Sequence, residues 1–160
     1  MRKTKALYII TAVLLIISLL VGCAPAKEDF ISDFNAKMSE KGLATLPKEM
    51  NVETEGNKKT LKSAALEDGI TLYVEFQNNK NKALKVELKS DGTNNNWNAY
   101  AVALIEMYST ENYPVETTVK KFDNFEFDGS VKIASDPRVD AVLEIDSNDY
   151  SVKSLTINRS

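Results

Sequence analysis

Ile70-Thr71-Leu72-Tyr73-Val74-Glu75-Phe76 decides the fold, because apolar side chains occupy every second position of this stretch. Such alternation is typical of a strand that packs one face on a core and leaves the other face in water. Residues 84–88, Leu-Lys-Val-Glu-Leu, repeat the pattern after the polar loop 77–81. Strands of a buried parallel sheet would show continuous apolar runs instead, so the two stretches predict an antiparallel sheet.

The sheet is expected to continue on both sides of this pair. Residues 60–66 form a weak strand candidate before the turn signal Glu67-Asp68-Gly69. Residues 43–57 contain Pro47 and little periodicity, so they are expected to be a connection. Apolar alternation returns later, in residues 125–127, 131–133, 139–145 and 150–157. Within the last of these the apolar phase changes near Lys153-Ser154, which predicts a β-bulge or bend.

A first helix is expected over residues 27–42. Phe30, Phe34 and Met38 recur at a spacing of four and form one apolar stripe. Gly42 follows the last periodic residue and is well placed to end the helix. The stripe predicts that one side of this helix packs against the sheet.

A second helix is expected from about residue 95 to residue 109. Trp97, Ala101, Leu104 and Tyr108 lie on one face of it. The short amides of residues 94–96 are expected to accept hydrogen bonds from its first N–H groups. Pro114 prevents the helix from continuing further.

Helices and antiparallel strands together predict an α+β fold, with two main helices packed on one face of the sheet. Residues 28–160 are long enough for a single globular domain with its own core. The order of elements is similar in outline to the cystatin-like and NTF2-like folds. This is an analogy of element order, and such a fold does not imply a function.

The N-terminus has the pattern of an export signal. Arg2, Lys3 and Lys5 precede residues 6–22, which carry no charge and are mostly apolar. The run ends in Leu20-Val21-Gly22-Cys23, which resembles the lipobox of bacterial lipoproteins. The resemblance implies cleavage after residue 22, a lipid on Cys23, a short tether over residues 23–27 and a place on the extracytoplasmic face of a membrane. An uncleaved N-terminal anchor is the alternative.

Composition narrows the possible functions. Removal of residues 1–22 takes away three bases and no acid, which changes the formal net charge from −3 to −6. Because no basic stripe is present, nucleic acid is not an expected partner. The chain has no histidine, and Cys23 is its one cysteine. Ser-His-Asp catalysis and the usual zinc sites therefore lack their residues, and no cofactor, metal site or catalytic residue is assigned.

Acidic residues suggest two weaker possibilities. The run Asn124-Phe125-Glu126-Phe127-Asp128-Gly129 superficially resembles the start of an EF-hand loop, but Ser135 stands where a bidentate glutamate belongs. An ordinary hairpin is the simpler interpretation. Asp136, Asp140, Glu144 and Asp146 could include a catalytic carboxylate pair, although a solvated strand face explains them as well. A hydrolase would use Glu126, Asp128, Asp136 and Asp140.

Aromatic residues offer a candidate interaction surface formed by Tyr73, Trp97 and Tyr100. Tyr73 lies on the polar phase of its strand, whereas Trp97 on an apolar stripe is more typical of a core. We therefore expect a non-enzymatic binding or interaction module of the cell envelope, with a protein, peptide or small ligand as partner. The alternatives are a hydrolase that uses only carboxylates and a structural envelope protein. The sequence leaves the oligomeric state open.

Overall fold

The computed structural model describes residues 29–56, 59–77, 82–109, 113–123, 131–132, 139–146, 149 and 151–159. The expected signal, tether and Cys23 lie outside these residues. The elements in chain order are α2 (Phe30–Glu40), β1 (Asn51–Gly56), β2 (Lys59–Glu67), β3 (Ile70–Gln77), β4 (Ala83–Ser90), α3 (Trp97–Tyr108), α4 (Val115–Asp123), β5 (Val131–Lys132), β6 (Val139–Ile145) and β7 (Lys153–Arg159).

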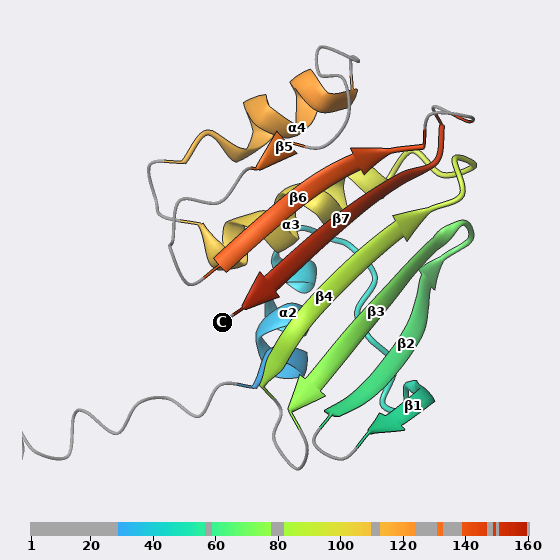
Figure 1. Ribbon diagram of the computed structural model, residues 1–160. Helices are drawn as coiled ribbons and strands as arrows, with labels where there is room; N and C mark the ends of the chain where they lie inside the picture. The colour runs from blue at the N-terminus through green and yellow to red at the C-terminus, as the bar shows by residue number, and fades with distance from the viewer. Residues whose placement is uncertain are drawn as a thin grey trace, which may run out of the picture.

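The strands form one seven-stranded sheet in the order β1-β2-β3-β4-β7-β6-β5. Every neighbouring pair is antiparallel. In Figure 1 the sheet faces the viewer, α2 and α3 lie behind it, and α4 lies beside α3. The α+β class with an antiparallel sheet and helices on one side is therefore confirmed.

The core lies between the sheet and the helices. Ile70, Leu72, Val74 and Phe76 on β3 are all buried, as their alternation predicts. A row of buried leucines crosses four neighbouring strands through the register pairs Leu72–Leu88, Leu88–Leu155 and Leu155–Leu143. Because side chains alternate along each strand, this row leaves the polar residues of the same strands on the opposite, open face of the sheet.

Helix α2 begins at Phe30, three residues later than expected, and ends before Gly42 as the sequence predicts. Asp29 is its N-cap, and its carboxylate accepts a hydrogen bond of 3.2 Å from the N–H of Ser32. Gly42 has a φ of +71° just after the helix, and the N–H of Leu43 reaches back to the carbonyl of Met38 at 2.9 Å. The apolar stripe of Phe30, Phe34 and Met38 is buried.

Two elements of the structure were not expected. Strand β1 lies in the segment predicted to be a connection, and it pairs along β2, which is a full strand. Helix α4 begins directly after Pro114, whose carbonyl accepts a hydrogen bond of 3.0 Å from the N–H of Thr118. Proline lacks the N–H group that a helix interior needs but tolerates a first turn, so Pro114 separates two helices.

Two local predictions need correction. Strand β7 pairs with β4 and β6 without a register shift, so the expected bulge is absent from the described strand. The apolar phase changes because the strand begins at Lys153, after a turn in which the N–H of Val152 reaches the carbonyl of Asp149 at 2.9 Å. The amides of residues 94–96 act as expected only in part. Asn96 is the N-cap residue of α3 and its side chain makes no capping hydrogen bond, but Oδ1 of Asn94 accepts a hydrogen bond of 2.8 Å from the N–H of Asn96.

Candidate functional site

The aromatic surface predicted from Tyr73, Trp97 and Tyr100 does not exist as one patch. Trp97 is 2% exposed and Tyr100 is 0% exposed, because both side chains point from α3 into the core. The indole of Trp97 packs on Phe122 of α4, with ring centroids 6.1 Å apart. Tyr73 is half-buried on the other side of the sheet. Trp97 and Tyr100 are therefore corrected to core residues, and Tyr73 alone is available for contact.

Tyr100 instead belongs to a partly buried hydrogen-bonded cluster. Its hydroxyl donates to Oε1 of Glu67 at 2.7 Å and accepts from the N–H of Ala44 at 2.9 Å. The side-chain amides of Asn94 and Asn96 donate to Oε2 of Glu67 at 3.0 and 2.8 Å. The cluster ties the end of β2 to the start of α3 and to the loop after α2. Its partners are distant in sequence, so no local pattern indicated it.

The cluster perturbs two ionisable groups. Hydrogen bonds donated by Asn96, Tyr100 and Asn94 stabilise the carboxylate of Glu67 and lower its pKa. Burial, together with the hydrogen bond to Glu67, raises the pKa of Tyr100 to about 12. Both shifts favour a carboxylate facing a neutral hydroxyl, which is a structural arrangement rather than a reactive one.

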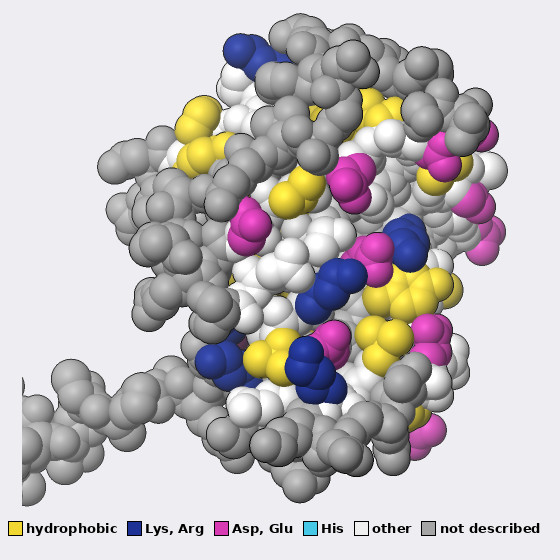
Figure 2. Space-filling model, viewed as in Figure 1, with side chains coloured by type: hydrophobic (Ala, Val, Ile, Leu, Met, Phe, Trp, Pro, Cys, Tyr) yellow, Lys and Arg dark blue, Asp and Glu magenta, His cyan; other side chains and the backbone are white. Residues whose placement is uncertain are grey.

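The open face of the sheet carries the remaining predicted contact residue. Tyr73 lies between Ser63 of β2 and Glu87 of β4 in the strand register. The ammonium group of Lys89 sits 5.0 Å from the centre of its ring. Figure 2 shows this face of the molecule, where basic, acidic and hydrophobic side chains are interspersed.

Ion pairs on this open face form both along one strand and between neighbouring strands. Glu87 lies 3.3 Å from the ammonium of Lys89 and 3.7 Å from that of Lys85. Lys59 and Glu75 are 2.6 Å apart one strand further along. Exposed pairs of this kind contribute about 0–1 kcal/mol each, so a partner could rearrange them at little cost.

A pocket of about 490 Å³ lies on the helical side of the sheet, where β4 begins and β7 ends. Its walls come from α2, the start of β4, the end of α3 and the end of β7. Residues that line it include Phe30, Asp33, Ala36, Lys82, Tyr108 and Arg159. Sequence reasoning missed this pocket, because four segments far apart in the chain contribute to it.

A second hollow, of about 480 Å³, lies where α2, α3 and the start of α4 meet. Its lining includes Lys37 and Glu106, whose charged atoms are 2.9 Å apart, while Lys41 also lies 3.1 Å from Glu106. Burial alone would raise the pKa of Glu106, but the two ammonium groups outweigh it and lower that pKa. The charges of Lys37, Lys41 and Glu106 therefore satisfy one another.

The candidate acids do not assemble into a site within the described residues. Glu144 and Asp146 are exposed, and Asp140 is half-buried on β6. Glu126, Asp128 and Asp136 lie outside the described part of the chain, as does most of the EF-hand-like run 124–135. Among the residues that are described, no group of three or more His, Cys, Asp or Glu side chains could hold a metal ion.

Comparisons with known proteins do not assign this chain to a family. No protein-family model, curated protein or solved structure matches this chain. None of the helices in the described ranges has the length and apolar character needed to span a bilayer.

Proposed function

We propose that the protein is a lipid-anchored module of a bacterial cell envelope that binds a protein or peptide partner through the open face of its sheet. The observation that carries the proposal is the position of Tyr73. It is a half-buried aromatic side chain on β3, the third of the seven strands, on the sheet face that the helices leave uncovered. Aromatic residues of this kind are common anchors at protein interfaces.

The charges around Tyr73 indicate the chemistry of the partner. Lys85 and Lys89 alternate with Glu87 on β4, and Glu75 lies on the neighbouring strand. A surface on which positive and negative charges lie close together fits a partner segment that also carries charges of both signs. This surface fits a nucleic-acid backbone poorly, because binding the phosphates would need a uniformly positive surface.

The lipid anchor rests on Leu20-Val21-Gly22-Cys23. A diacyl group would hold the protein stably, because each buried methylene contributes about 0.8 kcal/mol. From Cys23 to the helix cap at Asp29, an extended chain reaches at most about 20 Å. The domain would therefore work close to the membrane surface, with α2 at the tethered end.

A pull-down from membranes of cells that express the full chain tests the binding surface. We expect a crosslinked partner that Tyr73→Ala loses and Tyr73→Phe keeps, since the phenyl ring retains the apolar contact. Lys121→Ala on α4 is the control on the helical side and should capture the same partner. A partner captured equally by Tyr73→Ala would contradict the proposed surface.

Metabolic labelling with a radioactive or clickable fatty acid tests the anchor separately. The wild-type chain should incorporate the label, and Cys23→Ala should not. The variant should also leave the membrane fraction or be mislocalised. Unlabelled wild-type protein that stays in the membrane would instead support the uncleaved anchor.

A further inference from the structure

Strand β7 carries short polar side chains on the open face of the sheet. These three residues, Ser154, Thr156 and Asn158, form the β7 strip. In the strand register they lie opposite the longer side chains of β4, which are those of Lys89, Glu87 and Lys85. Figure 2 shows white polar surface on this face between charged and hydrophobic side chains. Because the strip is lower than its neighbour, another chain can lie along it.

The polar groups of the β7 strip are available to a partner. Among the described residues, the side chains of Ser154, Thr156 and Asn158 make no hydrogen bond. Ser154 and Thr156 are half-buried, and Asn158 is exposed. Hydroxyl and amide groups both donate and accept hydrogen bonds, so the strip suits the N–H and C=O groups of a polypeptide backbone.

The spacing of the β7 strip matches an extended segment. Side chains on one face of a strand recur at every second residue, which is a repeat of about 6.6–6.8 Å. An extended segment that runs along β7 has the same repeat, so its alternate side chains meet successive positions of the sheet. Strand β7 already has β4 and β6 as hydrogen-bonded neighbours. The segment therefore lies on the face of the sheet and does not add a strand to it.

Strand β6 supplies side chains that can select the segment. Glu144 pairs in register with Ser154, and Val142 pairs with Thr156. Glu144 is exposed, and no cation in the described part of the chain lies at ion-pair distance from it. Val142 is half-buried and offers apolar surface one repeat along the same strand. A basic side chain thus complements Glu144, and an apolar side chain complements Val142.

We propose that the partner of the open face contributes an extended segment that lies along β7 and carries a basic and an apolar residue two positions apart. The basic residue pairs with Glu144, the apolar residue packs on Val142, and the backbone of the segment hydrogen-bonds to the β7 strip. The inference rests on the proposed binding function of the open face and names the chemistry of the partner.

The experiment is photo-crosslinking of a short synthetic peptide to the full chain in isolated membranes. The peptide consists of serine and threonine with a lysine and a diazirine analogue of leucine two positions apart. Mass spectrometry then locates the labelled fragments of the protein. We expect saturable labelling of fragments from β6 or β7. The same peptide with glutamate in place of lysine should label them less.

Variants of Glu144 test the ion pair. Glu144→Gln should weaken binding of the lysine peptide about threefold, as expected for the loss of one exposed ion pair. Glu144→Lys should exchange the preference, so that the glutamate peptide labels better than the lysine peptide. A purely structural role of Glu144 would not produce this exchange. Equal labelling of the wild type by both peptides, or a preference that Glu144→Lys leaves unchanged, would overturn the proposal.

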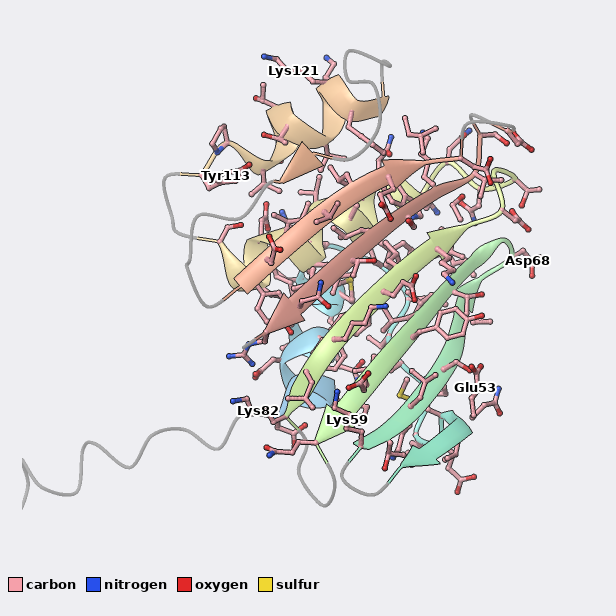
Figure 3. The ribbon with its side chains drawn as sticks, in the orientation of Figure 1. Glu53, Lys59, Asp68, Lys82, Tyr113 and Lys121 are labelled. Atoms are coloured by element: carbon pink, nitrogen blue, oxygen red, sulfur yellow. The ribbon has the colours of Figure 1, made fainter. Side chains whose placement is uncertain are left out.

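A matched substitution on the helical side is the control. Glu116→Gln removes the same group from an exposed position of α4, the helix that carries Lys121 in Figure 3, and should not change the labelling. Unlabelled peptides test the apolar contact. A competitor with valine at the apolar position should displace the probe better than one with serine there, and equal competition would contradict packing on Val142.

The cellular partner separates this inference from the function on which it rests. A partner that both Tyr73→Ala and Glu144→Lys lose in the pull-down supports the open face and the segment along β7. A partner that Tyr73→Ala loses but Glu144→Lys keeps would overturn the segment and leave the open face as the binding surface. A partner that both variants capture as well as the wild type would contradict both proposals.

Discussion

The hydroxyl of Tyr100 on α3 lies 2.7 Å from Oε1 of Glu67 at the end of β2 and joins the helical layer to the sheet. The same hydroxyl accepts the N–H of Ala44, so one side chain holds three segments together. Tyr100 is fully buried, and the two groups that its hydroxyl contacts belong to Glu67 and Ala44, which are half-buried. The contact thus ties α3 to the end of β2 and to the loop after α2.

Tyr100→Phe should therefore destabilise the fold without changing its shape. The substitution removes one hydroxyl and leaves the N–H of Ala44 and Oε1 of Glu67 short of a partner. We expect a loss of about 1–3 kcal/mol in the free energy of unfolding, measured by urea denaturation. Tyr73→Phe is the matched control on the open face and should change stability by less than about 0.5 kcal/mol. Equal effects of the two substitutions would contradict the role of the buried cluster.

The stability should fall in acid because of Glu67. Its pKa is lower in the folded protein than the ordinary value of 4.5, so the unfolded chain binds a proton more readily. The stabilisation is thus complete above pH 4.5 and is lost as the pH falls through the lower folded pKa. Glu67→Gln should be less stable than wild type at pH 7, and the gap should narrow at pH 3. A gap that stays constant between pH 7 and pH 3 would contradict this role of Glu67.

An alkaline transition should report on Tyr100. Its pKa is raised to about 12 from an ordinary value of 10.0, so the folded protein holds this proton more tightly than the unfolded chain. The corresponding stabilisation is complete below pH 10 and is lost as the pH rises through about 12. The stability gap between wild type and Tyr100→Phe should therefore be smaller at pH 11 than at pH 8. A difference in stability that grows from pH 8 to pH 11 would contradict a raised pKa of Tyr100 in the folded protein.

Two glycines should respond differently to alanine. Gly69 and Gly42 both have positive φ, of +77° and +71°. An added Cβ at Gly69 would overlap Thr93 Oγ1 and Asp91 Oδ1, whereas at Gly42 it meets nothing within 4 Å. Gly42→Ala should cost about 1–2 kcal/mol, the usual penalty of that backbone conformation. Gly69→Ala should cost more, as thermal unfolding of the two variants would show.

Apart from β1, the strands and the first helix could be predicted because their signals are local. The alternation in β3 and the stripe of Phe30, Phe34 and Met38 each lie within one element, and both are buried as expected. Helix α4 was missed although Val115, Val119 and Phe122 form a buried stripe, because Pro114 was considered only as the end of α3. A proline ends one helix and can begin the next.

The relationships between distant segments could not be predicted in the same way. The chain places β7 between β4 and β6, which no periodicity indicates. Glu67 and Tyr100 are 33 residues apart, and their contact depends on that packing. The pocket beside Lys82 and Arg159 likewise exists only once four segments meet. Tyr73 could be assigned to the open face because the phase of a single strand decides it.

Photo-crosslinking from position 73 in intact cells tests the central claim most directly. A photoreactive amino acid replaces Tyr73 in one variant and Lys121 in another, and crosslinked products are separated by mass. The proposed surface predicts a discrete protein or peptide adduct from position 73 and none of that mass from position 121. The same adduct from both positions, or from position 121 alone, would contradict a binding module that uses the open face of the sheet.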